Sequence, residues 1–291
     1  MSTQDVAAIE TPAYAMPAKR GVWSLMKALG WPGAVLAIFL LIALVGPLLA
    51  PGDPLGIHAL DVNKPPLTGG FPLGTDGVGR DQLSRVLYGA RLTLMIGLIP
   101  VVAATAISLT LSMLVVFGPS ALGFGVMRTM DIFLAFPGVM LALAVAAMLG
   151  PSVRNEILAL TIILVPLITR VARAAALDVA KRPYVAAARM AGASPIQVTR
   201  DTVLPNMLAP VLAYVAALGG LVIIAGAGLS FLGVGVQPPT AEWGRMVADG
   251  RDTFLINPWP SLIPGACIFL VCLSLNLAAD RLRDYLDPRL R

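Results

Sequence analysis

Uncharged apolar stretches and short polar segments alternate along most of the chain. A helix that spans a bilayer needs about 20 predominantly apolar residues, and an Arg, Lys or Asp at its centre costs roughly 2.5–3.5 kcal/mol. Stretches without charge therefore mark the candidate spans. Six of them lie between charged residues, at 27–53, 91–128, 131–154, 156–170, 201–242 and 252–280. This pattern predicts an all-α polytopic membrane protein with six transmembrane helices.

The fourth candidate span is the shortest. Only 13 uncharged residues separate Glu156 from Arg170, a length that by itself suggests a buried or re-entrant segment. Arg170 and Arg173 can extend their long side chains to the interface and so lengthen the helix. We therefore expect a span here too, and we place the fifth span at roughly 209–226.

The alternation divides the chain into five parts. We expect an N-terminal segment (1–30), a first transmembrane helix (31–50), a loop (51–90), a transmembrane domain (91–280) and a short tail (281–291). A polar insert at 178–206 interrupts the transmembrane domain.

Composition supports the membrane assignment, and the charge distribution gives the chain an orientation. Of the 291 residues, 57% are hydrophobic and 13% are charged, against about 25% charged in a typical soluble domain. Six spans place both termini on one side. If that side is the cytoplasm, cytoplasmic segments hold 14 of the 21 lysines and arginines, as the positive-inside rule requires. The termini and the insert are therefore expected in the cytoplasm, the loop at 51–90 outside, and the net charge of +5 needs no nucleic-acid partner.

Motifs for catalysis or metal binding are not evident. Cys267 and Cys272 have a spacing that fits neither a redox pair nor a zinc site, and His58 has no Cys or His neighbour. The glycine-rich stretch at 74–80 lacks the GxxxxGK(S/T) pattern of a phosphate-binding loop. We therefore expect neither enzyme activity nor a cofactor in this chain. The spans lack ionisable residues near their centres, which disfavours a proton-coupled carrier, although a stand-alone secondary carrier stays open as an alternative.

The polar insert reads YVAAARMAGASPIQVTRDTVLPN at 184–206. Pro183, just before it, suits the first position of a helix. Gly192 is the residue type expected in a left-handed helix cap, and Ser194 with Gln197 forms a capping box for a second helix. We therefore expect two short helices joined at a glycine elbow.

The second helix of the insert is expected to run to Leu204, where Pro205 marks the return to the membrane. Alanines at 186–188 leave one face of the first helix with almost no side chain, so the surface of another protein can approach closely. An ordinary amphipathic connector between two spans is the alternative interpretation.

Five stretches of the chain resemble a known family. AAARMAGASPIQVTRDTVLPN resembles the EAA loop of ATP-binding-cassette (ABC) importer permeases, in which a small-residue helix, a glycine and a later proline have fixed spacing. Four more resemble the dipeptide/oligopeptide group of these permeases, which has an added N-terminal span: FPLGTDGVGRDQLSRVLYGARLTL, MRTMDIFLAFPGVMLAL, LSFLGVGVQPPTAEWGRMVADGRD and NLAADRLRDYLDPRLR. The resemblance covers roughly Val22 to the end of the chain, with the motifs in the family's order.

The resemblance implies a type I ABC-importer permease fold in a multi-pass subunit of the bacterial cytoplasmic (inner) membrane. Such a subunit forms half of a translocation pathway, here for di- or oligopeptides, and leaves ATP hydrolysis to partner subunits. The implied partners are a homologous second permease, two ATP-binding subunits that hold ATP and Mg, an extracytoplasmic substrate-binding protein and membrane lipid. Related permeases with these motifs leave nickel, glutathione or another small solute as alternative substrates.

The resemblance also implies that the insert is a coupling helix that docks on an ATP-binding subunit. The residues implied in coupling are Tyr184, Ala186, Ala187, Ala188, Gly192, Ala193, Ser194 and Pro205. The glutamate that gives the motif its name falls at Ala186, and the histidine before the final proline falls near Asp201, so the polar anchor of the family loop is not matched here. The loops at 53–85 and 233–260 are implied to contact the substrate-binding protein.

Overall fold

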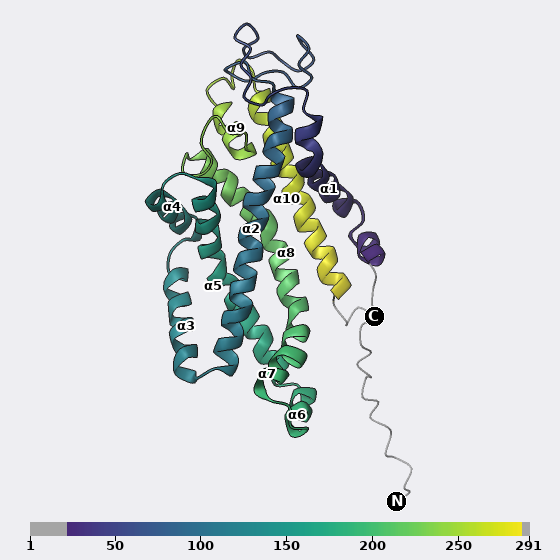
Figure 1. The fold of residues 1–291 in the computed structure, drawn as a ribbon, viewed down its shortest axis with the longest axis vertical. Helices are drawn as coiled ribbons and strands as arrows, with labels where there is room; N and C mark the ends of the chain where they lie inside the picture. The colour runs from purple at the N-terminus through teal and green to yellow at the C-terminus, as the bar shows by residue number, and fades with distance from the viewer. Residues whose placement is uncertain (1–21, 287–291) are drawn as a thin grey trace, which may run out of the picture.

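The computed structural model describes residues 22–286, and this part of the chain is helical apart from its loops and two isolated β-bridges (Figure 1). The helices are α1 (Val22–Leu49), α2 (Gln82–Phe117), α3 (Ser120–Leu134), α4 (Gly138–Leu149), α5 (Val153–Ala180), α6 (Pro183–Met190), α7 (Pro195–Gln197), the π-helix η1 (Val198–Val203), α8 (Leu204–Phe231), α9 (Trp243–Asp249) and α10 (Trp259–Leu286). Most of the predicted N-terminal segment and the end of the predicted tail, residues 1–21 and 287–291, lie outside the described residues.

Five helical runs are long and apolar enough to cross a membrane. They are α1 from Leu29 onward, α2, α5, the unbroken run Pro195–Phe231 that ends with α8, and α10 up to Tyr285. Helices α3 and α4 supply a sixth span only if the two count together. The chain is therefore an all-α, multi-pass membrane protein, as the hydropathy pattern predicted.

The third predicted span is not one helix. Helix α3 begins at Ser120, well before the apolar stretch, and carries Asp131 within it. The chain then breaks before Pro137, and α4 continues at an angle of 92° to α3. Proline disfavours the helical conformation in the residue before it, so Phe136 is not helical and α3 ends at Leu134. The predicted third span is thus divided between the end of α3 and the whole of α4.

Helices α2, α5 and α8 extend beyond the ranges predicted for their spans. Helix α5 runs through Arg170 and Arg173, and Arg170 pairs with Asp131 of α3 at 2.6 Å between exposed side chains. Helix α8 extends past both ends of the range predicted for the fifth span. Helix α2 begins at Gln82, so residues 82–90 of the segment expected as a loop are helical.

Two clusters of buried side chains hold the helices together. The larger lies among α2, α5 and α8, and the smaller joins α1, α2 and α10. Glycines allow α2 and α8 to approach closely, because a Cβ at Gly97 would lie 2.3 Å from Ile223 and one at Gly226 would lie 2.7 Å from Ile96. Small residues at helix contacts are typical of membrane bundles, where lipid offers no hydrophobic drive for association.

The loops at one end of the bundle form a layer that we call the cap, residues 50–81 and 232–258, drawn at the top of Figure 1. Trp243 fixes the cap to the helices. Its side chain is fully buried, its Nε1 donates to the carbonyl of Val86 at 3.0 Å, and its ring meets Phe39 edge-on at 5.7 Å. Glu242 caps α9 and also accepts a hydrogen bond from Thr93 of α2 at 2.8 Å.

Arg85, in the first turn of α2, joins the two cap segments. Its side chain is 1% exposed, and its Nη1 donates to the carbonyl of Pro54 at 3.3 Å and to that of Pro239 at 3.2 Å. The same guanidinium lies 3.6 Å from the carboxylates of Asp76 and Asp249, one in each segment. Removing one partner from such a buried group leaves an uncompensated charge, so these contacts hold both loops in place.

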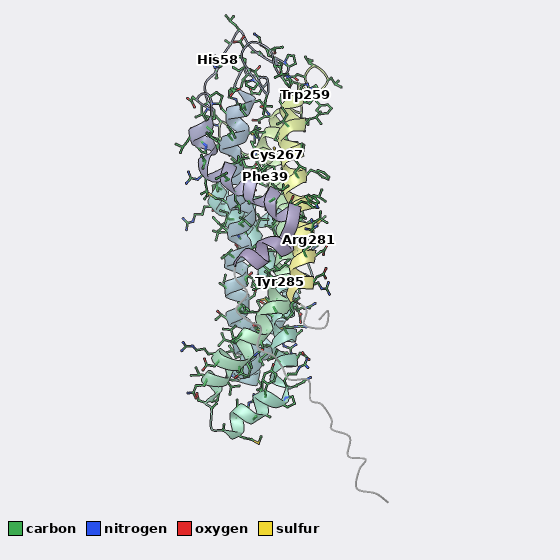
Figure 2. The ribbon with its side chains drawn as sticks, turned by 90° about the vertical axis from the view of Figure 1, so that its right-hand side faces the viewer. Phe39, His58, Trp259, Cys267, Arg281 and Tyr285 are labelled. Carbon is green, nitrogen blue, oxygen red and sulfur yellow. The ribbon has the colours of Figure 1, made fainter. Side chains whose placement is uncertain are left out.

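Helix α1 changes direction at Gly30, where φ is +57°. The break exposes the carbonyl of Leu29, which accepts a hydrogen bond from Nη1 of Arg281 at 2.7 Å. A Cβ at Gly30 would lie 2.0 Å from that nitrogen, so glycine meets both the backbone and the steric requirement. Figure 2 shows Arg281 on the part of α10 remote from the cap, which carries His58.

The buried position of Trp243 gives a test of the cap. Trp243→Ala is expected to lower the free energy of unfolding by about 3–5 kcal/mol, because it removes a fully buried indole and leaves a cavity. Trp259 is the matched control, since its side chain is 43% exposed, and its replacement by alanine is expected to change stability by about 0.5 kcal/mol or less. Chemical unfolding in detergent followed by circular dichroism measures both. Equal losses would contradict the assignment of Trp243 as the anchor.

Candidate functional site

The polar insert forms a compact unit at the end of the bundle opposite the cap (Figure 1). We call residues 181–203 the hairpin. Helix α5 ends at Ala180, Arg182 is extended with ψ of 145°, and Pro183 occupies the first turn of α6. Proline suits this position because it has no N–H to leave unpaired. The predicted start of the first helix is confirmed.

The elbow after α6 has the geometry predicted for Gly192, whose φ is +87°. The N–H of Ala193 donates to the carbonyl of Ala188 at 3.1 Å, and that of Gly192 donates to the carbonyl of Arg189 at 3.0 Å. These two bonds make a Schellman motif, which satisfies the last carbonyls of a helix and requires a left-handed residue. The direction of the chain at the elbow is therefore fixed by backbone hydrogen bonds.

The capping box at the start of α7 is also present. The N–H of Gln197 donates to Oγ of Ser194 at 3.3 Å, and the N–H of Ser194 donates to Oε1 of Gln197 at 2.8 Å. Two backbone donors at the helix start are thus paired within the loop itself. The hairpin owes its local shape to short-range contacts that the sequence specifies.

The expected end of the second helix at Leu204 is wrong. The π-helix η1 follows α7 directly and leads into α8, so Pro205 lies in the first turn of α8 without a break. The N–H of Leu204 donates to the carbonyl of Thr199, five residues earlier. In a regular α-helix the ring of Pro205 would collide with the carbonyl of Asp201. The π turn at Val198–Val203 includes Asp201 and is wider than an α turn, so it leaves room for the proline ring and the helix continues.

One consequence is a single long helix from the elbow to the cap. The run Pro195–Phe231 comprises 37 residues, which corresponds to roughly 55 Å at about 1.5 Å per residue. It is one uninterrupted helical run, although Pro205 and Pro210 within it have no N–H to donate. We call this run the long helix.

The inner face of the hairpin packs on the helix bundle. Val185 of α6 and Val198 and Val203 of η1 are buried at 0–1% exposure within the larger core cluster. Ala188 and Ala193 are half-buried against the same cluster. Two of the alanines predicted to face an ATP-binding subunit therefore lie on the side that faces the bundle.

The remaining predicted residues are exposed, all of them on the hairpin except Pro205, which lies in α8. The exposed ones are Tyr184, Ala186, Ala187, Gly192, Ser194 and Pro205. Two apolar side chains that sequence reasoning missed project beside them, because Met190 is 83% and Ile196 78% exposed. Their signal was present in the sequence, as isolated apolar residues on either side of the glycine elbow. Large exposed apolar side chains next to small residues suit a protein interface with high shape complementarity.

A groove of about 630 Å³ separates the hairpin from the end of α2. Leu109, Met113 and Phe117 line it from α2, and Ile196 and Leu204 line it from the other side. The hairpin is thus closely packed on α5 and α8 but not on this part of α2.

Among residues 22–286, no set of three or more His, Cys, Asp or Glu side chains comes together that could hold a metal ion. The hairpin itself is rich in cations, with the exposed residues Lys181, Arg182, Arg189 and Arg200. Arg182 pairs with Asp178 at 2.8 Å and Arg200 with Asp201 at 3.8 Å. Exposed charges of this kind suit contact with a polar protein surface.

Comparisons of sequence point to transport proteins. The family described as "Binding-protein-dependent transport system inner membrane component" matches residues 108–291. The chain is 41% identical over 285 residues to the di/tripeptide transport system permease protein DppC of Pseudomonas aeruginosa (strain UCBPP-PA14), covering 96% of this chain and 94% of that protein. It is 40% identical over 256 residues to the probable D,D-dipeptide transport system permease protein DdpC of Escherichia coli (strain K12), covering 88% and 85%.

Solved structures agree at the level of the fold. An inward-facing MetNI methionine ABC transporter is similar with a TM-score of 0.58 and 18% identity, over 69% of this chain and 96% of that chain. An amino acid ABC transporter is similar with a TM-score of 0.56 and 16% identity, over 69% and 94%. The shared part is a helical permease fold.

The left-handed elbow gives a test of the hairpin. Gly192→Ala is expected to lower stability by about 1–2 kcal/mol, because a side chain is unfavourable at positive φ. Gly125→Ala in α3 is the matched control, since a Cβ meets no atom within 4 Å at either site and only the backbone conformation differs. Thermal unfolding of the two purified variants measures the difference. An unchanged or raised unfolding temperature for Gly192→Ala would contradict the assigned role of the elbow.

Proposed function

This chain belongs to the family of binding-protein-dependent transport system inner membrane components, as its motifs indicated, and we propose that it is a permease subunit of an ATP-driven importer for di- or oligopeptides. It forms half of the translocation pathway in the bacterial cytoplasmic membrane. The other half is a homologous second permease. The peptide specificity is supported by relatives named for di/tripeptide and D,D-dipeptide transport.

The orientation of the subunit follows from its charges. The hairpin side holds the excess of lysine and arginine, so it faces the cytoplasm together with both termini. The cap then faces outward, toward a substrate-binding protein. Two ATP-binding subunits contact the hairpin from the cytoplasm and hold the ATP and Mg, and lipid surrounds the exposed apolar side chains of the spans.

The observation that carries the proposed coupling is the continuity of the hairpin with the long helix. The ATP-binding subunit contacts the small residue Ala187 and the apolar side chains of Met190 and Ile196. When the two ATP-binding subunits close on ATP, they displace the elbow. The hydrogen bonds of the Schellman motif and the capping box resist a local change in the backbone conformation of the elbow. The displacement therefore moves the long helix and, with it, the cap end of the pathway.

ATP hydrolysis by the complex tests the function as a whole. The transporter is purified through this chain, and hydrolysis is measured with and without the binding protein plus mixed short peptides. We expect peptides to stimulate hydrolysis in the wild type. In Gly192→Val we expect hydrolysis to continue while peptide uptake into vesicles falls, because a β-branched residue at φ of +87° distorts the elbow.

Three other outcomes of this experiment are decisive. Hydrolysis that responds to nickel or glutathione but not to peptides would retain the importer and change its substrate. An intact preparation without any ATPase subunit would favour a stand-alone secondary carrier. Normal peptide uptake by Gly192→Val would remove the coupling role of the elbow.

Docking is tested at Ala187, an exposed small residue of α6. Ala187→Trp is expected to weaken capture of the ATP-binding subunits by about tenfold or more, equivalent to ~1.4 kcal/mol, because the indole prevents close approach. Ala187→Ser is the matched control at the same position and is expected to bind like the wild type. Quantitative pull-down measures both. If the Trp variant captures as much subunit as the Ser variant, the contact lies elsewhere.

A further inference from the structure

A cavity of about 560 Å³ opens within the cap, remote from the hairpin. One wall is the first cap segment, with Leu55, Ile57 and Val78, and the other includes Phe231 at the end of the long helix. This volume lies in the range of small-molecule sites, about 300–1,000 Å³.

The walls of the cavity are held in fixed positions. Arg85 ties both cap segments to α2 through the carbonyls of Pro54 and Pro239. Across the cavity floor, Arg80 contacts Asp76 of its own segment at 2.6 Å and Asp249 of the other at 3.5 Å. A preformed site loses little freedom when a ligand binds. The two cap segments that line the cavity are therefore tied to α2 and to each other by polar contacts.

The charges of the lining fall into an inner and an outer group. The inner ones satisfy each other, as Arg80 does with Asp76 and Arg245 does with Asp249 at 2.8 Å. The outer pair is Arg251 and Asp252, whose side chains are 72% and 82% exposed and lie 3.5 Å apart. An exposed pair of this kind contributes little to stability. Its two members are thus available to a ligand that brings charges of its own.

The turn that carries Arg251 is itself well fixed. Gly250 lies against Ser261 of α10, where a Cβ would be 2.4 Å from the serine Oγ. The N–H of Arg251 donates to the carbonyl of Ala248 at 3.2 Å. The backbone below the guanidinium is therefore set, and only the side chain has to turn toward a ligand.

Apolar side chains complete the lining of the cavity. Contact with lipid does not explain their exposure, because they lie outside the spans. Leu55 is 46%, Ile57 66% and Val78 48% exposed, and all three belong to the cap and not to a span. Large apolar groups exposed to water beside convergent charges are typical of a binding surface. They offer a place for an uncharged side chain.

The charged side chains of the lining indicate which kind of ligand the cavity can bind. Four of the six charged side chains in the lining pair with one another, which leaves Arg251 and Asp252, one of each sign, for a molecule with one positive and one negative end. A sphere of the cavity's volume is about 10 Å across, and a di- or tripeptide is about 7–11 Å long when extended. Arginine binds a carboxylate through paired hydrogen bonds, and a carboxylate pairs with an ammonium group. Free peptide termini meet these requirements.

We propose that the cap cavity binds a short zwitterionic peptide, with the peptide carboxylate on Arg251, its ammonium group on Asp252 and its side chains on Leu55 and Ile57. The inference rests on the proposed function, since it names a site for the substrate class of that importer. It goes beyond it by placing a peptide site in this chain, outside the spans. Phe231 connects the site to the long helix, so the helix that starts at the elbow also ends in the wall of the cavity.

Direct binding tests the site. The assembled transporter is placed in lipid nanodiscs without its binding protein, and binding of labelled dialanine is measured by equilibrium dialysis. N-acetyl-dialanine and dialanine amide, each lacking one terminal charge, serve as the comparison ligands. We expect the wild type to bind dialanine at least tenfold better than either derivative.

Two variants assign the ends of the peptide. Arg251→Gln is expected to weaken dialanine binding about tenfold and to abolish the preference over the amide. Asp252→Asn is expected to do the same for the preference over the N-acetyl derivative. Arg283→Gln and Asp284→Asn are the matched controls, because both residues are exposed on α10 at the end remote from the cap, and they are expected to bind like the wild type.

Contrary outcomes are separable from failure of the proposed function. Absence of dialanine binding, or equal binding by wild type and both cap variants, would overturn the cavity site. If peptides plus binding protein still stimulate ATP hydrolysis in that preparation, the importer stands and the site alone fails. Cap variants that bind dialanine normally but capture less binding protein would instead make this surface a docking site and overturn the inference. Dialanine binding without peptide-stimulated hydrolysis would uphold the site and count against the importer.

Discussion

The continuity of the long helix is the constraint on which the rest of the structure depends. Within a membrane every backbone N–H and C=O must be paired inside the protein, and proline normally interrupts that pairing. The π turn at Val198–Val203 resolves the conflict before Pro205, so helical hydrogen bonding passes from the elbow into the bundle. The long helix therefore runs from the hairpin to the cap, with Phe231 as its last residue.

The cap and the hairpin are stabilised by different kinds of polar contact. At the cap, Arg85 is buried between backbone carbonyls and two aspartates, an arrangement that is costly unless every contact is kept. At the hairpin, the charges are exposed and the shape comes from local hydrogen bonds. The cap is therefore held by buried contacts between segments far apart in the chain, and the hairpin by contacts within a few residues.

Local sequence determined much of the hairpin because its interactions span only a few residues. The proline start of α6, the left-handed Gly192 and the Ser194–Gln197 box were all predictable from residue types and spacing. The break assigned to Pro205 was not, because whether a proline ends a helix depends on how the preceding turn adjusts. Nor could spacing tell that Ala188 turns inward while Ala187 turns outward, since both are alanine and only the packing on the bundle distinguishes them.

The sequence by itself determined that the protein is helical, lies in a membrane and belongs to a permease family, because hydropathy and ordered motifs depend on composition and short spacing. Only the tertiary structure decided the angle of 92° between α3 and α4 and the complete burial of Trp243. It also decided that Asp76 and Asp249 both lie beside Arg85. Arg85 and Asp249 are 164 positions apart in the chain. Contacts at such separation leave no periodic signal, so the cap and its cavity emerge only when the helices are packed.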